Sequence, residues 1–291
     1  MGTYAVTGSA SGMGHEAAER LRRAGHSVIG VDLGDAEVIA DLSTRPGREA
    51  AAAEVLSRCD GRLDGAVLAA GIGPRSGAGQ CRSIFEINFF GAIELLDTWR
   101  PALATAGTAK VVVIGSNSAT TTPLVPRRAV RALLAHDATK ATRALRGFGP
   151  LAPPLAYAAS KIALTRWVRR HAVAPQWADA GIRMNVLAPG AIDTPLLQKQ
   201  LADPRTARAI RSFPVPTGGF GDPGHLADWM VFMMSDAAEF LCGSVIFVDG
   251  GTDACLRSDD WPRRYPTSRL PRYVRRVLAF RRRYSGRCSR Q

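Results

Sequence analysis

The apolar run Thr3–Val6 leads directly into Thr7-Gly8-Ser9-Ala10-Ser11-Gly12-Met13-Gly14, and a helical pattern then covers Glu16–Ala24 and stops at Gly25. In a turn of this kind between a strand and a helix, free N–H groups at the helix N-terminus favour a diphosphate. Gly8 would allow the tight turn, Gly12 the close approach of the backbone to the diphosphate, and Gly14 the packing of helix on strand. The stretch predicts a dinucleotide site at the start of an α/β domain.

Short apolar runs alternate with helical patterns over most of the remaining chain. Alternation of this kind implies right-handed crossovers and a parallel sheet covered on both faces. We therefore expect a single doubly wound Rossmann-type α/β domain with a seven-stranded parallel sheet. The predicted strands are Thr3–Val6, Ser27–Val31, a shorter Glu37–Asp41, Gly65–Ala69, Lys110–Ile114, Ile182–Leu187 and Ser244–Val248.

An acidic residue, Asp32, closes the second predicted strand, 24 positions after Gly8. A carboxylate at this point accepts hydrogen bonds from the adenosine ribose hydroxyls and repels a 2′-phosphate, so NAD is predicted in preference to NADP. The alternative is a solvated aspartate that starts the turn before Gly34. The sequence has no Gly-x-x-x-x-Gly-Lys-Ser/Thr motif, which argues against a P-loop nucleotidase.

The composition is that of an ordinary globular protein, with 46% hydrophobic and 22% charged residues in 291. The formal net charge is +13, but residues 257–291 hold twelve arginines and two acids, a net of +10, which leaves about +3 for residues 1–256. Five scattered cysteines without a Cys-x-x-Cys motif are typical of reduced thiols, so we expect a cytoplasmic protein. The five histidines lack metal-ligand spacing, and no metal site is predicted.

Three side chains are candidates for acid–base chemistry. Tyr157 and Lys161 are four residues apart, which places the phenol and the ammonium on one helical face. A nearby cation favours the phenolate, so Tyr157 is a plausible general acid and base near neutral pH. Ser116 follows the predicted strand Lys110–Ile114, at the sheet edge where ligands of α/β domains bind.

Further motifs occur in the order of the short-chain dehydrogenase/reductase family, which the chain resembles over residues 3–256. They are Leu68-Ala-Ala-Gly71, Asn88, Asn185-x-x-x-Pro189-Gly190-x-x-x-Thr194-Pro195 and Val248-Asp249-Gly250-Gly251. The departures are few. Ala69 stands where many members have Asn, and Ser118 is an alternative to Ser116 as the group that polarises the substrate.

The resemblance implies an NAD-dependent alcohol dehydrogenase or carbonyl reductase that transfers hydride between the nicotinamide and a carbonyl carbon. By this resemblance Tyr157 exchanges the proton, and Lys161 lowers the tyrosine pKa and binds the nicotinamide ribose. Ser116 binds the substrate oxygen, and Asn88 holds a water of the proton relay. The cofactor-binding residues are expected to be Gly8, Ser11, Gly12, Met13, Gly14, Asp32, Leu33, Asp41, Leu42, Ala70, Gly71, Tyr157, Lys161, Pro189, Gly190, Ile192 and Thr194.

Within the family, Ala36–Leu42 and Cys59–Pro74 resemble the bacterial 3α-hydroxysteroid dehydrogenase/carbonyl reductase branch. Ser116 and Tyr157 are 41 residues apart, farther than in most members, which indicates a helical insertion at about 120–154. In that branch a similar insertion covers the tetramer surface and leaves a homodimer. A mobile lid over the substrate is the alternative.

The expected substrate is a small apolar alcohol or ketone, with a 3α-hydroxysteroid implied by the branch and a flexible lid implied at about 195–225. Another aromatic or alicyclic alcohol or diol is the alternative substrate. A protein of a different class, a non-catalytic NAD-binding sensor, is the second alternative; the four intact residues Asn88, Ser116, Tyr157 and Lys161 argue against it.

The arginine-rich segment 257–291 is expected to form a tail outside the dehydrogenase domain of residues 1–256. Leu270, Tyr273, Val274, Val277 and Leu278 fall at helical spacing, with arginines on the remaining faces. A basic amphipathic helix of this kind is suited to an anionic membrane or to nucleic acid. The alternatives are a solvated, partly disordered extension and an extension without biological origin.

Overall fold

Seven parallel strands form one sheet in the computed structural model, which describes residues 1–75, 77, 79–202, 204–261 and 265–284. Their spatial order is β3-β2-β1-β4-β5-β6-β7, so the order reverses beside β1, and the predicted doubly wound parallel sheet is confirmed. The strands are β1 (Thr3–Thr7), β2 (Ser27–Asp32), β3 (Val38–Ile39), β4 (Gly65–Leu68), β5 (Lys110–Ile114), β6 (Arg183–Pro189) and β7 (Val245–Val248). In this architecture ligands bind at the carboxyl ends of the strands, next to the point of reversal.

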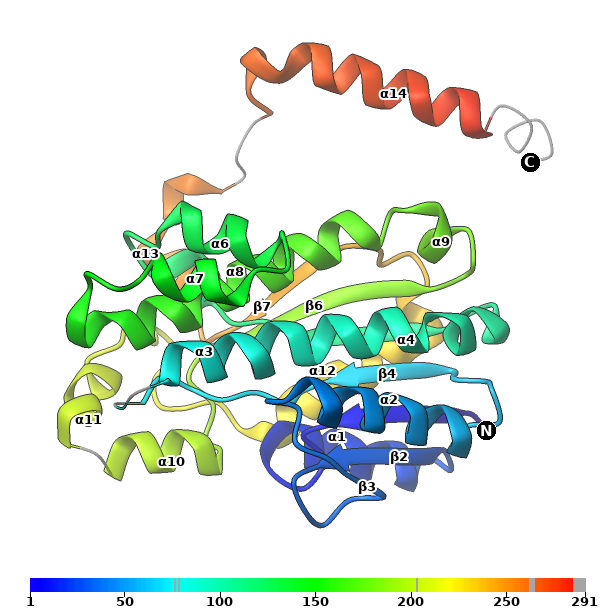
Figure 1. Ribbon diagram of the computed structural model, residues 1–291, viewed down its shortest axis with the longest axis horizontal. Helices are drawn as coiled ribbons and strands as arrows, with labels where there is room; N and C mark the ends of the chain where they lie inside the picture. Colours follow the sequence, from blue (N-terminus) through cyan, green and yellow to red (C-terminus); the bar gives the residue numbers. More distant parts are fainter. Residues whose placement is uncertain (76, 78, 203, 262–264, 285–291) are drawn as a thin grey trace. The chain divides into compact units, whose positions relative to one another are not determined.

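The sheet separates two apolar layers, because successive side chains of a strand point to opposite faces. The large helices are α1 (Gly12–Arg23), α2 (Arg45–Arg58), α4 (Gly91–Ala106), α8 (Ala152–His171) and α12 (Pro223–Met234). On β5, Val111 and Val113 pack with α2, α4 and α8, whereas Val112 and Ile114 pack with α1 and α12. Figure 1 shows these two sets of helices on opposite sides of the sheet.

The helix that carries Asn88 is interrupted by a π-helical turn. Here α3 (Gln80–Phe85) continues through the turn Glu86–Phe90 into α4. Such a turn adds one residue to a helix and is frequent at functional sites. It places Asn88, which is 1% exposed, against the loop that follows β4.

The insertion consists of short helices, the longest of which packs onto α8 (Figure 1). Val130, Leu133, Ala141 and Leu145 are buried in the same apolar cluster as the α8 residues Ala159 and Leu164, which accounts for the helical pattern in the sequence. Its elements are α5 (Ser118–Thr121), α6 (Arg127–Leu133), α7 (Ala138–Arg143) and a 3₁₀ turn (Gly149–Leu151).

Helix α8 begins at Ala152, five residues before Tyr157. Pro153 and Pro154 lie in the first turn, where backbone N–H groups have no partner within the helix, so proline costs nothing there. Tyr157 and Lys161 therefore lie on consecutive turns inside an established helix.

The described chain divides into two units, residues 1–256 and 257–291. None of the described helices is both long and apolar enough to cross a bilayer. Part of the predicted tail, residues 262–264 and 285–291, lies outside the described residues. The remaining elements of the first unit are α9 (Pro175–Ala178), α10 (Pro195–Ala202), α11 (Pro204–Arg211), a 3₁₀ turn (Asp236–Ala238) and α13 (Thr252–Leu256). The second unit contains 3₁₀ turns at Ser258–Asp260 and Thr267–Arg269 and the helix α14 (Leu270–Tyr284).

Candidate active site

In the glycine-rich turn after β1, two glycines lie so close to neighbouring backbone atoms that no side chain would fit there. Gly8 has φ +71°, and a Cβ atom there would lie 2.9 Å from the backbone nitrogen of Ala70. A Cβ atom at Gly14 would lie 2.2 Å from the Gly8 carbonyl oxygen, since the first turn of α1 packs directly on the loop. Gly12 has φ +59° and faces Thr194 across the cleft. The backbone N–H groups at the start of α1 are thereby presented to a ligand.

A cleft at the carboxyl ends of β1, β2 and β4 collects most of the predicted cofactor-binding residues. Those that line it are Gly8, Ser11, Gly12, Met13, Gly14, Asp32, Leu33, Asp41, Leu42, Ala70, Gly71 and Thr194. The same cleft is lined by residues that the motifs did not single out as ligands: Val31, Ala40, Ala69, Ile72, Ile87, Pro195 and Leu196. These are apolar neighbours of motif positions. The sequence could have pointed to them, because each is close in the chain to a motif position on an element predicted to reach the edge of the sheet.

Asp32 joins the second strand to the glycine-rich turn. Its carboxylate accepts hydrogen bonds from the backbone N–H of Ala10 at 2.9 Å and of Leu33 at 2.7 Å. A carboxylate has about four acceptor positions, so two remain for further donors such as ribose hydroxyls. Asp32 lines the cleft at the end of β2, with its negative charge where an adenosine ribose would lie in this architecture.

Ser116, Tyr157 and Lys161 converge at the carboxyl end of β5. The Ser116 hydroxyl forms a side-chain hydrogen bond with the Tyr157 phenol, and Ser116 Oγ accepts the Ser118 backbone N–H at 3.1 Å. The Lys161 ammonium donates to the Ile114 carbonyl oxygen at 2.8 Å and lies 5.8 Å from the centre of the Tyr157 ring. Helix α8 thus aims both of its polar groups at the end of one strand.

Burial shifts the pKa of both titratable groups of this cluster. Desolvation lowers the pKa of the Lys161 ammonium to about 8, because the protein interior disfavours the charge. Desolvation raises the pKa of the Tyr157 phenol, and the hydrogen bond from Ser116 offsets part of that rise. The expected lowering of the tyrosine pKa is therefore not found in this structure, where desolvation outweighs it and the Lys161 ammonium is directed to Ile114.

The Asn88 side chain binds both backbone polar groups of Ile72. Its Oδ1 accepts the Ile72 N–H at 2.8 Å, and its Nδ2 donates to the Ile72 carbonyl oxygen at 2.9 Å. A Cβ atom at Gly71 would lie 3.3 Å from Asn88 Oδ1 and 4.0 Å from Lys161 Nζ, so these three residues meet at one point. Asn88 thereby holds the loop after β4 in place. Its expected role in holding a water stays a prediction.

Of the residues predicted at the end of β6 and in the loop after it, Thr194 lines the cleft. Ile192 is buried beneath the sheet and pairs with Gly221, and neither it nor Pro189 or Gly190 lines the cleft. Gly190 is pressed against Asp249, where a Cβ atom would lie 2.8 Å from the Asp249 Cα. Asp249 in turn accepts the Asn117 side-chain amide at 3.2 Å, which ties the residue after Ser116 to the terminal strand.

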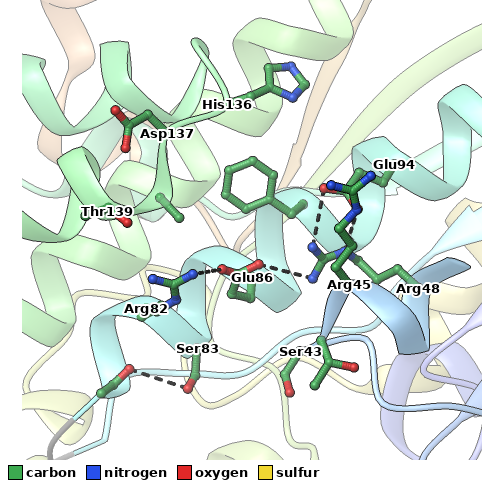
Figure 2. Close-up of a pocket in the computed structure, with 14 residues that line it drawn as sticks. Ser43, Arg45, Arg48, Arg82, Ser83, Glu86, Glu94, His136, Asp137 and Thr139 are labelled. Carbon is green, nitrogen blue, oxygen red and sulfur yellow. Dashed lines mark hydrogen bonds and ion pairs between the residues drawn. The ribbon is translucent and has the colours of Figure 1, made fainter.

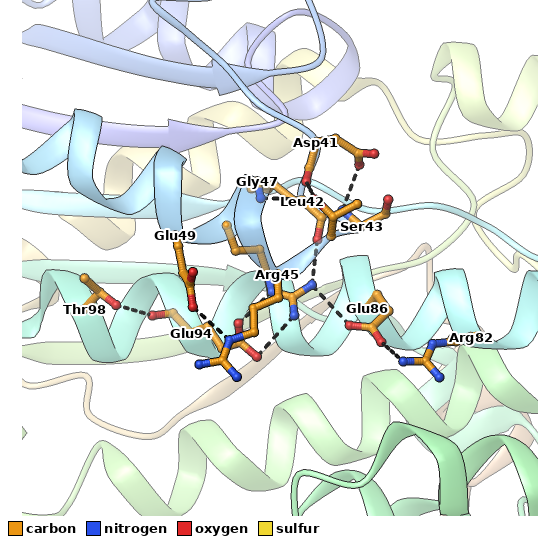
Figure 3. A network of polar contacts seen from close by, with 12 residues as sticks. Asp41, Leu42, Ser43, Arg45, Gly47, Glu49, Arg82, Glu86, Glu94 and Thr98 are labelled. Atoms are coloured by element: carbon orange, nitrogen blue, oxygen red, sulfur yellow. Dashed lines mark hydrogen bonds and ion pairs between the residues drawn. The ribbon is translucent and has the colours of Figure 1, made fainter.

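A second cavity of about 640 Å³ lies between α2, the π-helical turn and the insertion (Figure 2). Its floor is a charged network centred on Arg48, which is 4% exposed and was not singled out from the sequence. Arg48 pairs with Glu86 at 3.1 Å and with Glu94 at 2.7 Å, and it donates to the Leu42 carbonyl oxygen at 3.1 Å. Figure 3 shows how the network joins Leu42, which lines the cofactor cleft, to the helix that carries Asn88.

Comparisons with known proteins cover both halves of the first unit. The family model described as short chain dehydrogenase matches residues 3–126, and the model described as Enoyl-(Acyl carrier protein) reductase matches residues 138–253. The 3-alpha-hydroxysteroid dehydrogenase/carbonyl reductase of Comamonas testosteroni is 41% identical over 257 residues, 88% of this chain and 98% of that protein. A tropinone reductase homolog of Arabidopsis thaliana is 27% identical over 86% of this chain and 78% of its own length.

Among solved structures, the 3-alpha-hydroxysteroid dehydrogenase of Pseudomonas sp. B-0831 complexed with NADH superposes with a TM-score of 0.82. It is 44% identical, and the match covers 88% of this chain and 99% of that one. The aldohexose dehydrogenase of Thermoplasma acidophilum, 23% identical with a TM-score of 0.68 over 91% of this chain and 97% of its own, shares the fold.

Proposed function

The chain belongs to the short-chain dehydrogenase/reductase family of NAD(P)-dependent oxidoreductases, and from this premise we propose that it interconverts an apolar secondary alcohol and its ketone with NAD(H). The observation that carries the proposal is the Ser116–Tyr157 hydrogen bond beside the buried Lys161, at the strand edge next to a cleft lined by Asp32. A site that only bound a dinucleotide would not need this cluster.

The cleft fits a dinucleotide on two observations from the chain itself. The glycine-rich turn leaves a cradle whose backbone conformation at Gly8 and Gly12 disfavours side chains. The carboxylate of Asp32 keeps free acceptor positions after binding Ala10 and Leu33. When bound, the nicotinamide supplies the hydride acceptor or donor. Gly8, Gly12, Asp32 and Thr194 would hold the group in the cleft.

The acid–base step is assigned to Tyr157. A phenol with a raised pKa stays protonated at neutral pH, so it is ready to donate its proton to a carbonyl oxygen. Ser116 would hydrogen-bond the same substrate oxygen, since its hydroxyl already lies against the phenol. Lys161 has two N–H groups beyond the one that binds Ile114, and these are available to ribose hydroxyls.

The choice of NAD over NADP is proposed from Asp32, whose charge lies where a 2′-phosphate would approach.

The steroid class is proposed from the likeness to the Comamonas and Pseudomonas hydroxysteroid dehydrogenases, which the chain matches over nearly their whole lengths. The expected homodimer is proposed on the same likeness and on the packing of α6 onto α8. Sedimentation velocity of the full chain tests the dimer.

The test of the reaction is NADH formation by the purified chain with 3α-hydroxysteroids and with simpler secondary alcohols. NADP and the variant Tyr157→Phe are run alongside. We expect turnover with NAD and a loss on the order of 10²–10⁴-fold in the variant, the usual contribution of a general acid and base. Binding of NAD without turnover of any alcohol would contradict the proposal. Equal turnover in the Tyr157→Phe variant would contradict the assignment of the proton step.

A further inference from the structure

Helix α14 of the second unit is divided lengthwise into an apolar face and an arginine face. At about 100° per residue, five of its apolar side chains fall within roughly 140° of the helix circumference. They are Leu270, Tyr273, Val274, Val277 and Leu278. Arginines occupy the opposite side: Arg272, Arg275, Arg276 and Arg283. Arg281 falls on the apolar side near the C-terminal end, where a long side chain can extend its charge toward water.

The apolar face is exposed along its whole length. Its five side chains are between 36% and 58% exposed, whereas apolar residues at the same spacing in α4 are fully buried. On this face the Tyr273 ring meets the Tyr265 ring edge-on, at 5.6 Å between ring centres. A contiguous exposed apolar face of this kind marks a site of interaction.

The charge on this segment specifies the partner. Leu270–Tyr284 holds six arginines and no acidic residue, and no Asp or Glu follows Asp260 to the end of the chain. The complementary surface is therefore anionic. It must also accept an apolar face, which an anionic bilayer does, because the acyl chains lie just below the charged headgroups.

We propose that α14 binds the surface of an anionic lipid bilayer, with its axis in the plane of the interface. Fifteen residues of helix extend about 22 Å, short of the roughly 30 Å of hydrocarbon, so α14 would lie on the bilayer and not cross it. Nucleic acid is the less favoured partner, since phosphate contacts use the arginines and leave Val274 and Leu278 unused.

This surface lies outside the part of the chain shared with the relatives. The family models end at residue 253, and 88% of this chain accounts for 98% of the Comamonas protein. The proposal therefore does not depend on the proposed reaction, and either can fail alone.

The experiment is co-sedimentation of the full chain with vesicles of phosphatidylcholine alone or mixed with phosphatidylglycerol. We expect binding to the mixed vesicles that weakens as salt is raised, and weak binding to phosphatidylcholine. Two double variants separate the two faces. Arg275→Glu with Arg276→Glu reverses charge, and Val274→Gln with Leu278→Gln removes the centre of the apolar face at constant charge. Each arginine near an anionic surface contributes about fivefold to partitioning, so we expect losses of roughly tenfold or more in both variants.

Matched controls place the same changes on the first unit. Arg23→Glu with Arg128→Glu changes the net charge equally, and Val173→Gln with Phe240→Gln removes two exposed apolar side chains. Both controls are expected to bind the mixed vesicles as the parent does, and thermal melting checks that every variant is folded.

Three outcomes would overturn the proposal. The first is full binding by the Val274→Gln, Leu278→Gln variant, which would make the contact purely electrostatic. The second is tight, salt-dependent binding to duplex DNA with no binding to vesicles. The third is self-association without vesicles that the same variant abolishes, which would assign the apolar face to a second copy of the chain.

Discussion

The carboxylate of Asp32, at the end of β2, accepts a 2.9 Å hydrogen bond from the backbone N–H of Ala10, in the turn that follows β1. The residue proposed to select the cofactor therefore also holds the glycine-rich turn from the neighbouring strand. One side chain thus links the discrimination between NAD and NADP to the shape of the turn that would hold the diphosphate.

Removing the charge of Asp32 is expected to relax the discrimination between NAD and NADP. In Asp32→Asn the ratio of kcat/KM for NAD to that for NADP should fall on the order of tenfold, since about 1.4 kcal/mol of lost like-charge repulsion is a factor of ten. The matched control is Asp35→Asn, which removes the same charge from an exposed residue three positions after Asp32. An unchanged ratio in Asp32→Asn would assign Asp32 to the turn alone.

Replacing Ser116 and Ser118 one at a time distinguishes the two candidate polarising groups. Ser116→Ala is expected to lower kcat/KM by roughly 10²-fold, because it removes the hydroxyl bonded to Tyr157. The Ser118 Oγ is buried without a hydrogen-bond partner in the described residues, so Ser118→Ala should preserve activity and leave stability equal or higher. Steady-state kinetics and thermal melting of both variants check this. A larger loss of activity in Ser118→Ala would reverse the assignment.

The pH dependence of the reaction should differ between its two directions. Because desolvation raises the pKa of the Tyr157 phenol, the proton-donating form dominates at neutral pH. We expect kcat/KM for carbonyl reduction to be flat near neutral pH and to fall in the alkaline range, while kcat/KM for alcohol oxidation rises toward alkaline pH. An acidic optimum for oxidation would contradict the assignment of this phenol as the base.

Burial of Lys161 is expected to make stability rise with pH. Its pKa is about 8 in the folded chain and 10.5 in the reference state, so between these pH values the unfolded chain holds a proton that the folded chain has released. The free energy of unfolding then increases with pH through this window, by up to about 3 kcal/mol relative to Lys161→Met, which cannot titrate. Urea unfolding of both proteins from pH 7.5 to 10 measures the difference. A difference that is constant with pH would contradict burial as the cause.

Arg48 and Arg45 offer a matched comparison of a buried and an exposed arginine in one helix. Arg48→Met removes the ion-pair partner of Glu94 and one of the two partners of Glu86, and should destabilise the chain by about 3 kcal/mol. Arg45, 78% exposed and paired with Glu49, should tolerate the same change with little loss of stability. Since Arg48 also holds the Leu42 carbonyl, we expect KM for NAD to rise in Arg48→Met with kcat little changed. Equal effects of the two substitutions would show that the network contributes no stability.

Patterns local in the chain were enough to predict the sheet and the glycine-rich turn. β1 and β2 are short, mostly apolar runs that end next to Gly8 and at Asp32. Runs of this kind are typical of strands that a parallel sheet buries on both faces. The spacing of Tyr157 and Lys161 was enough to predict that their side chains share one helical face, because residues four apart in a helix do so whatever surrounds them.

Only the tertiary structure decided what depends on residues distant in the chain. The direction of the Tyr157 pKa shift follows from the burial of the phenol, which no spacing reveals. The partners of Asn88 and Arg48, Ile72 and Glu94, lie 16 and 46 residues away. Hydrogen bonds and burial of this kind depend on how helices and strands pack against one another. The strands, the turn and the helical faces depend only on the spacing of residue types along the chain.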